Sequence, residues 1–496
     1  MSYAWIGAPT PFNGTNDALG GDSSTENLNQ WFQPGDQAYI IVASAMVLLM
    51  IPGLGFLYSG LARRKSALSM IWACMASSSV VTFQWYFWGY SLAFSNYSTN
   101  GFIGDLRKFG LQNTLGAPSP GSPLIPELLY AFYQMQFCAV TAAIVMGSVA
   151  ERGRLIPAMV FIFCWATIVY CPLAWWAWGA NGWGFSWGVM DYAGGGPVEI
   201  GSGLTALAYS WVLGRRQEKM MLNFRPHNVS LITLGTILLW KWSMVGWCSG
   251  TISGLVAATP ASGYLTPWAS VILGICTGII ANFATKIKYW IKIDDAMDVF
   301  AEHGVAGIVG LLFNAVFAAD YITGLDGVNT GGLPGGWIQH NWKFMYIQIA
   351  YIVACSAYTF VVSALIAYII NWIPGLKLRA SEEAELLGMD DDQLGEFAYD
   401  YVEVRRDYLA WTPAKSDPED KPHQIPQGDR YGIPSHSQML EGKEPSESSS
   451  DGQRPMPVAA GDRHAVAYEK SEREKAAEGL HQAPPPPPSS GQGKEQ

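Results

Sequence analysis

Long apolar runs between residues 38 and 374 constrain this chain more than any other feature of its sequence. Half of the 496 residues are hydrophobic and only 14% are charged, and the charges are unevenly placed. A bilayer core is matched by a run of about 20 apolar residues, so several such runs indicate a polytopic all-α membrane protein. A soluble all-α protein with an apolar core is the alternative interpretation.

Nine runs are predicted to cross the membrane. They lie near residues 38–61, 67–94, 126–149, 156–179, 197–213, 228–260, 264–285, 298–318 and 344–371. A basic cluster follows every odd-numbered run, as Arg63-Arg64-Lys65 follows the first, although Arg107 and Lys108 lie in an even-numbered loop. The positive-inside rule therefore predicts an N-terminus outside the cell and a C-terminus in the cytoplasm.

Composition divides the chain into four predicted parts. They are an extracellular segment (1–37), a transmembrane domain (38–374), an ordered cytoplasmic region (375–411) and a disordered cytoplasmic tail (412–496). The tail is rich in Pro, Ser, Gly and charge, so it cannot bury a core. Serines among acidic residues at 446–451 are predicted sites for kinases, because phosphate charge would change how a tail docks. A solvated tail without any switch is the alternative.

Two segments resemble each other, DYAGGGPVEIGSG (191–203) and DAMDVFAEHGVAG (295–307). Each begins with Asp and carries a titratable residue eight positions later, Glu199 in the first and His303 in the second. The predicted orientation makes the two segments cross in opposite directions, as in transporters built from inverted repeats. We therefore expect Glu199 and His303 to face each other near the middle of the membrane.

A buried Glu–His pair has a chemical use beyond packing. An unpaired polar group in hydrocarbon costs several kcal/mol, so Glu199 and His303 are expected to share a hydrogen bond and a proton. A packing pair without any transport role is the alternative. Glu302 lies about 100° further round the helix, so it cannot point into the same narrow pore as His303. Asp191 and Asp295 are predicted to be structural acids that cap helix starts.

The two repeat segments and three other stretches carry a family resemblance. The stretches are IPGLGFLYSGLARRKS (51–66), GSVAERGR (147–154), the extended form IDDAMDVFAEHGVAG, and GEFAYDYVEVRRDY (395–408). With them the chain resembles the ammonium transporter family (Amt/Mep/Rh), and within it the fungal Mep-type permeases. The resemblance implies an inverted-repeat fold of eleven spans, a homotrimer with one pore in each protomer, and nitrogen uptake as ammonium across the plasma membrane.

The same resemblance implies roles for particular residues. His303 matches the second member of the family's twin-histidine pair, and Glu199 stands where most relatives have the first. Phe137 matches the outer phenylalanine gate and Trp178 the aromatic residue of the outer ammonium site, which Tyr133 could join. Aromatic faces attract a small cation, although packing or an interfacial belt is the alternative for these rings.

The resemblance also predicts how the substrate crosses. An apolar pore rejects ammonium but passes neutral ammonia, so the proton must move separately or be held near the Glu–His pair; the transported species stays open. An inside-negative potential would favour inward charge by about 2.3 kcal/mol per 100 mV. The sequence contains no nucleotide motif, metal-ligand cluster or nucleophile triad. We expect no enzyme activity, no cofactor, no metal and no nucleic-acid partner.

The chain departs from the family pattern at Trp240–Lys241. The end of the sixth family span and all of the seventh are absent there, so about nine or ten spans remain of eleven. Lys241 then falls near the middle of the unusually long run 228–260. A wrongly spliced gene model is the favoured explanation, and a genuine truncated isoform is the other. The gap motivates a second hypothesis, a non-conducting ammonium sensor or a defective subunit in a heterotrimer with related permeases.

Overall fold

The computed structural model describes residues 32, 34–114, 117–122, 124–217, 228, 232, 244–323, 335–396 and 398. All of them belong to the first of two compact units, residues 1–413. The predicted tail at 412–496 and the predicted junction at Trp240–Lys241 lie outside the described residues. Within the described part of the chain the regular structure is helical and contains no strand, which confirms the predicted all-α class.

Seven helices among the described residues are long and apolar enough to cross a membrane. They are Pro34–Leu61, Arg64–Phe94, Glu127–Val149, Leu155–Trp187, Pro267–Ile291, Phe300–Phe317 and Lys343–Trp372. Each matches one of the nine predicted runs. The fifth predicted run forms η7 (Gly195–Ile200) followed by α8 (Gly201–Leu213). Part of the sixth forms α11 (Met244–Ala261), an 18-residue helix that can cross about 27 Å by itself.

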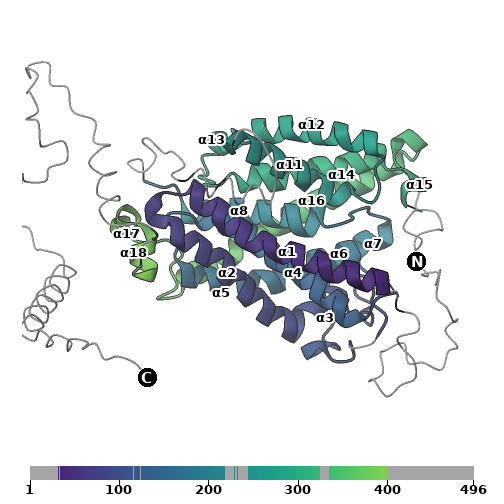
Figure 1. Ribbon diagram of the computed structural model, residues 1–496, viewed down its shortest axis with the longest axis horizontal. Helices are drawn as coiled ribbons and strands as arrows, with labels where there is room; N and C mark the ends of the chain where they lie inside the picture. Colours follow the sequence, from purple (N-terminus) through teal and green to yellow (C-terminus); the bar gives the residue numbers. More distant parts are fainter. Residues whose placement is uncertain are drawn as a thin grey trace, which may run out of the picture. The chain divides into compact units, whose positions relative to one another are not determined.

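The first half of the described unit is a cluster of mutually packed helices. Its members are α1 (Pro34–Leu61), α2 (Ala67–Gln84), α3 (Tyr90–Phe94), α4 (Glu127–Val145), α5 (Leu155–Trp165) and α6 (Cys171–Trp178). Helix α1 packs against α2 and α4, and α2 packs against α5. Figure 1 shows these helices, in purple and blue, gathered on one side of α8.

The second half lies on the other side of α8 (Figure 1). Its members are α11, α12 (Pro267–Ala284), η8 (Phe300–Val305), α14 (Ala306–Phe317) and α16 (Lys343–Trp372). Helix α11 contacts α12 and α14, while α16 contacts α8 and α14. Helix α8 therefore joins the two halves, and η7 at its start is held between them.

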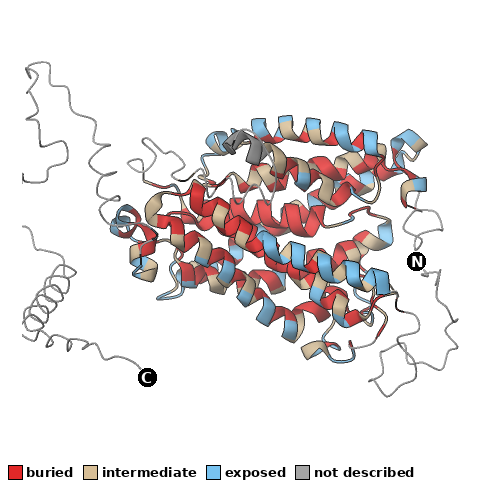
Figure 2. Ribbon diagram, viewed as in Figure 1, coloured by how far each residue is buried: buried red, intermediate tan, exposed pale blue. Residues whose placement is uncertain are grey.

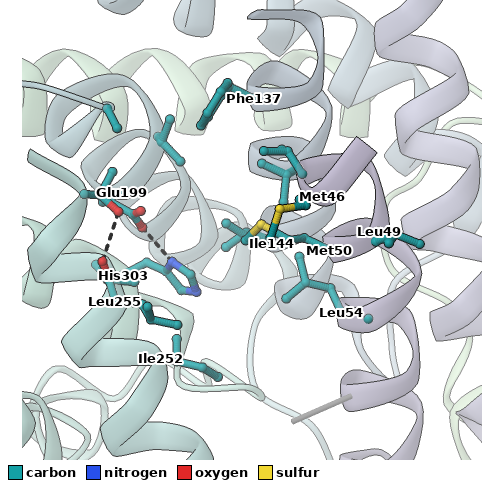
Figure 3. Close-up of a pocket in the computed structure, with 17 residues that line it drawn as sticks. Met46, Leu49, Met50, Leu54, Phe137, Ile144, Glu199, Ile252, Leu255 and His303 are labelled. Carbon is teal, nitrogen blue, oxygen red and sulfur yellow. Dashed lines mark hydrogen bonds and ion pairs between the residues drawn. The ribbon is translucent and has the colours of Figure 1, made fainter. Parts of the chain in front are cut away.

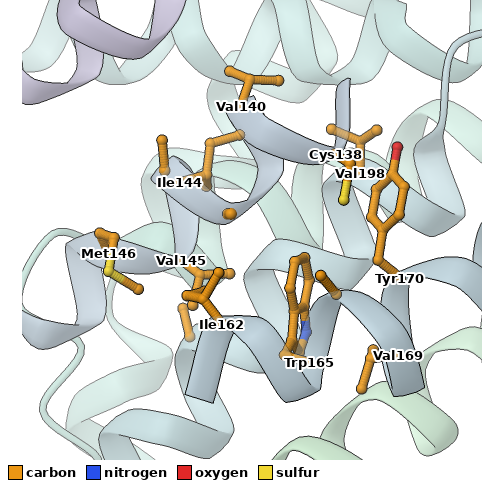
Figure 4. Close-up of a cluster of buried hydrophobic side chains, with 14 of the residues drawn as sticks. Cys138, Val140, Ile144, Val145, Met146, Ile162, Trp165, Val169, Tyr170 and Val198 are labelled. Carbon is orange, nitrogen blue, oxygen red and sulfur yellow. The ribbon is translucent and has the colours of Figure 1, made fainter. Parts of the chain in front are cut away.

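The distribution of buried and exposed side chains is that of a membrane protein, with a packed core and an apolar outer surface. Large side chains such as Trp165 and Tyr170 are fully enclosed, and Figure 4 shows them packed with Cys138 and Val145 between α4 and α5. The outward sides of α1 and α12 are exposed but apolar, as the pale blue stripes of Figure 2 show. Apolar exposure along whole helices is what a lipid-facing surface requires.

Charged residues at the helix ends next to the basic clusters form an ion-pair network. The Glu151 carboxylate accepts hydrogen bonds from Arg63 Nε at 3.3 Å and Arg216 Nη1 at 2.7 Å. Arg216 Nε also pairs with Asp294 Oδ2 at 2.8 Å. Burial alone would raise the pKa of Glu151, but Arg63 and Arg216 outweigh it and hold the pKa below its ordinary value. This network ties together the four segments that carry Arg63, Glu151, Arg216 and Asp294, on the side that carries the basic clusters.

The segment after α16 packs against the same end of the helices. It forms α17 (Glu382–Leu387) and α18 (Met389–Leu394). The Asp390 carboxylate accepts hydrogen bonds from the backbone N–H groups of Leu68 and Ser69 at 3.0 and 2.7 Å. Those groups lie in the first turn of α2, where helical N–H groups lack partners in their own helix. The docked segment therefore supplies a cap to α2.

Candidate functional site

Asp191 organises the start of the segment that carries Glu199. Its carboxylate accepts hydrogen bonds from the backbone N–H groups of Gly194, Gly195 and Gly196. Tyr351 donates its hydroxyl to the same carboxylate at 3.0 Å. The acid therefore binds the N–H groups at the start of η7, a π-helical segment, which is the kind of contact that a helix-capping acid makes.

Asp295 does the same for the segment that carries His303. Its Oδ2 atom accepts a hydrogen bond from Phe300 N at 2.8 Å, at the first residue of η8. Burial, and secondarily the nearby Asp298, raises the pKa of Asp295 to about 6. The contact lies at a helix start, where the sequence predicted a cap. Both η7 and η8 are π-helical, a rare form that is often found at functional sites.

The two capped segments cross each other through glycine residues. A methyl group on Gly203 would lie 2.2 Å from Gly304 N, and one on Gly307 would lie 2.6 Å from Glu199 Cβ. Positions 199 and 303 correspond in the repeat, as do 203 and 307, so the approach of a methyl group on Gly203 to His303 C at 3.3 Å corresponds to the approach of one on Gly307 to Glu199. The chain directions are opposite at the crossing. This arrangement agrees with the predicted inverted repeat.

Glu199 and His303 meet at this crossing. The distance between His303 Nδ1 and Glu199 Oε2 is 2.8 Å. Their side chains are only 8% and 6% exposed, for His303 and Glu199 respectively. The predicted contact between the two side chains is therefore present, and Figure 3 shows it at one side of a cavity.

The cavity has a volume of about 270 Å³ and a largely apolar wall. Helix α1 contributes residues between Met46 and Leu54, and the loop before η7 and η7 itself contribute Ala193 and Val198. The other apolar positions come from α4 and α11; they are Phe137, Val140, Ile144, Ile252, Leu255 and Val256. Glu199 and His303 are the ionisable groups of this lining. A hydrogen-bonded carboxylate and imidazole thus face a space that is poor in other polar groups.

The three predicted aromatic residues are not gathered around this cavity. Phe137 lines it, and the ring of Tyr133 meets the Phe137 ring edge-on at 4.9 Å between centroids. Trp178 instead donates its indole N–H to Asp191 O at 3.0 Å and stacks on Phe94 at 6.1 Å. Trp178 therefore reaches the site through Asp191, the residue that caps η7.

Two further outcomes concern residues near the pair. Glu302 is half-buried and does not line the cavity, as its angular separation from His303 led us to expect. Sequence reasoning missed the contribution of α1, where Met46, Met50 and Gly53 line the cavity. Their spacing of four and three residues places them on one helix face, which could have identified them. Among the described residues, no group of three or more His, Cys, Asp or Glu could hold a metal ion.

Comparison with known proteins gives a consistent result. The family model described as Ammonium Transporter Family matches residues 38–240 and 241–399. Ammonium transporter MEP3 of Saccharomyces cerevisiae is 52% identical, covering 75% of this chain and 85% of its own. Ammonium transporter 2 of Schizosaccharomyces pombe is 45% identical, covering 84% and 89%. The crystal structure of Candida albicans Mep2 has a TM-score of 0.70 at 41% identity, covering 81% and 96%.

The same comparisons bear on the predicted gap. The family match is divided between residues 240 and 241, at the predicted junction. The alignment with MEP3 runs over 420 residues, although it uses only 75% of the 496 residues of this chain. It therefore includes positions that this chain lacks. With two-thirds of the chain matched and relatives at up to half identity, the chain belongs to the ammonium transporter family, among its fungal Mep-type members.

Proposed function

We propose that this chain is an ammonium uptake permease of the plasma membrane. Family membership supports ammonium transport across a membrane, by a transporter rather than an enzyme. The single observation that carries the finer proposal is the Glu199–His303 contact of 2.8 Å beside an otherwise apolar cavity. Intramembrane ionisable groups that face a cavity are functional sites by default.

The apolar wall of the cavity supports a mechanism in which ammonia crosses as a neutral molecule and its proton moves separately. Side chains such as Val140, Ile144 and Ile252 offer no hydrogen bonds, so a charged ion would lose its hydration there without compensation. A neutral ammonia molecule avoids most of this cost. The proton is accepted by the Glu199–His303 pair, whose short contact allows it to be shared between a carboxylate and an imidazole.

We place the outer ammonium site and gate at Phe137, Tyr133 and Trp178. Phe137 lies in the cavity wall with Tyr133 against its edge, which supports a gate formed by these two rings. Trp178 is anchored to the backbone of Asp191, so it is held in a fixed position near the start of η7. Faces of such rings attract a small cation with about 0.5–2 kcal/mol each.

The driving forces are the ammonium gradient and the membrane potential. The proposed orientation has the N-terminus outside and the C-terminus in the cytoplasm, and each protomer of a trimer has its own pore. The inside-negative potential then favours inward movement of positive charge by about 2.3 kcal/mol per charge per 100 mV. Kinases acting on the tail serines are the proposed regulators.

Uptake of radiolabelled methylammonium tests the proposal. The full chain is expressed in cells that lack other ammonium permeases, and surface protein is quantified in parallel. We expect saturable uptake above that of cells carrying an empty vector. Surface-localised protein that supports no uptake, alone or with any related subunit, would refute the permease function.

The positions missing after Trp240 favour a second candidate. A chain with an incomplete wall could be a non-conducting sensor or a defective subunit that assembles with intact permeases. Insertion of the missing positions between residues 240 and 241 discriminates between the candidates. Uptake that appears only after the insertion would show that the present chain does not conduct by itself, whereas equal uptake without it would remove this candidate.

A further inference from the structure

The inverted repeat makes the two halves of the described unit unequal. Four crossings precede the segment that carries Glu199; they contain α1, α2 with α3, α4, and α5 with α6. Between α8 and the segment that carries His303, the described residues contain only α11 and α12. Counting backwards from the paired segments makes α11 the counterpart of α4, and both helices line the cavity. The counterparts of α1 and α2 are then not among the described residues.

By symmetry, the counterpart of α1 would form part of the cavity wall. Helix α1 lines the cavity with residues from Met46 to Leu54, so its symmetry mate would line it too. Figure 3 shows Met46 and Met50 of α1 across the cavity from Ile252 and Leu255 of α11. Met46 is 65% exposed and Leu255 is 51% exposed, although both line the cavity. Among the described residues, nothing closes the side between these helices.

The chain itself is too short to close that side with two crossings. Ile232 lies against Gly60 at the inner end of α1, because a methyl group on Gly60 would be 2.8 Å from Ile232 Cγ1. Helix α11 begins at Met244 and ends near the outer loop, where Pro260 O accepts from Tyr192 N. About 11 residues separate Ile232 from Met244, and they span at most ~40 Å when extended. Two crossings of a core of about 30 Å need about 40 helical residues.

The open face of α11 is suited to another helix. Gly250 and Gly254 are four residues apart, and a methyl group on either would meet nothing within 4 Å. Small residues at this spacing allow close packing between helices in membranes. The family match divides just before this helix, between residues 240 and 241, and the alignment with MEP3 includes positions that this chain lacks. Sequence, symmetry and surface therefore point to the same occupant.

We propose that the groove between α1 and α11 binds a unit of two apolar membrane-crossing helices supplied by a second polypeptide of the same family. The unit would pack on the Gly250–Gly254 face and complete the cavity wall opposite α1. Docking of the unit is independent of transport, whereas any gain in uptake rests on the proposed permease function. Lipid tails are the competing occupant of the groove.

Co-purification tests the docking. The tagged full chain is co-expressed with a separate fragment of MEP3 that contains the residues aligned between positions 240 and 241. Met46→Trp and Leu255→Trp fill the groove, while Ile275→Trp on α12 and Val353→Trp on α16 are matched controls at residues that are each 60% exposed. We expect the fragment to purify with the full chain and with both controls. When the variants are compared at equal amounts of protein on the cell surface, each groove variant should co-purify about one-fifth as much fragment as the controls, or less. The added tryptophan overpacks the groove and so disfavours docking.

The outcomes separate docking from transport. The same fragment inserted in cis between residues 240 and 241 serves as the check that its sequence folds with this chain. Failure of the separate fragment to purify with the full chain, or equal loss in groove and control variants, would overturn the proposal and leave lipid as the occupant. Docking without methylammonium uptake would support the groove assignment and contradict the permease function alone.

Discussion

At the scale of single residues, the Glu199–His303 contact depends on two neighbouring positions being glycine. Gly203 and Gly307 allow the two backbones to approach until the carboxylate and the imidazole are 2.8 Å apart. The burial of both side chains makes either one costly to leave without its partner. The pair and the two glycines therefore act as one unit, in which the glycines set the distance and the pair supplies the chemistry.

Replacement of Glu199 tests the chemistry directly. Glu199→Ala removes the carboxylate that faces His303, so the proton has no acceptor pair beside the cavity. We expect methylammonium uptake to fall about tenfold or more, which corresponds to about 1.4 kcal/mol in the barrier. Surface level and assembly state are measured by surface labelling and native electrophoresis and should be unchanged. Glu199→Gln is the shape-matched control for loss of charge, and unchanged uptake in both variants would refute the assigned role.

Replacement of Gly203 tests the helix crossing. The added methyl group of Gly203→Ala would lie 2.2 Å from a backbone atom of Gly304, so the helices must separate. Overpacking of this kind costs about 1–3 kcal/mol, and we expect a lower thermal unfolding midpoint and reduced uptake. Gly278→Ala on α12 is the matched control, because a methyl group there meets nothing within 4 Å. Equal effects of both variants would contradict the close crossing.

Residue identities beyond the pair were only partly predictable. The eight-residue spacing from Asp to the titratable residue identified Glu199 and His303 because it recurs in both segments. The place of Trp178 was not predictable in the same way. Its indole is directed by a hydrogen bond to Asp191 O and by the Phe94 ring, and both contacts arise from packing between α3, α6 and the loop before η7.

At the scale of elements, the two π-helical segments are each started by an acid. Asp191 binds three backbone N–H groups of η7, and Asp295 binds Phe300 N of η8. A π-helical turn carries one residue more than an α-helical turn, which changes the direction of the side chains that follow it. Hydrophobic periodicity cannot show this insertion, so the sequence predicted continuous spans where the structure contains a change of helix type.

Asp295 leads to a prediction about pH. Its pKa is raised to about 6 by burial first and by Asp298 second, whereas an unfolded Asp has a pKa near 3.8. The folded state therefore binds the proton more tightly, so this group adds stability as pH falls below about 6 and loses it as pH rises through 6. We expect the wild-type free energy of unfolding to rise between pH 7.5 and pH 5 by about 1.4 kcal/mol relative to Asp295→Asn, because pH 5 lies about one unit below the folded pKa.

The control for this prediction lies at the opposite end of the helices. Asp320 is exposed at the start of α15 (Asp320–Thr323), so Asp320→Asn should follow the wild-type dependence on pH. Asp298 and Lys288 face the same region as Asp295 and form an ion pair of 2.7 Å that both proteins retain. An Asp295→Asn protein with the full wild-type rise toward pH 5 would contradict the assignment to Asp295.

At the scale of the whole molecule, orientation and charge movement are linked. The basic clusters follow odd-numbered runs, and several of their residues lie in the network around Glu151 at one end of the helices. If ammonium or its equivalent enters with a net charge, an inside-negative potential of 100 mV favours entry by about 2.3 kcal/mol per charge.

Simultaneous measurement of current and uptake tests this link. We expect about one positive charge to enter for each methylammonium molecule taken up, because ammonia and its proton both cross in this mechanism. Depolarisation of the membrane should then reduce uptake at a constant gradient. Uptake without current, unaffected by depolarisation, would instead identify passage of neutral ammonia alone.

The sequence alone predicted which runs cross the membrane, which side each loop is expected to face and which two ionisable residues correspond in the repeat. Those properties are local, because they depend on the length of apolar runs, the positions of Arg and Lys, and a short spacing within one segment. Only the tertiary structure decided that Glu199 and His303 touch across glycine contacts, that α1 and α11 share a cavity wall, and that one side of this wall stays open. These features depend on how segments about a hundred residues apart pack together, which no local pattern specifies.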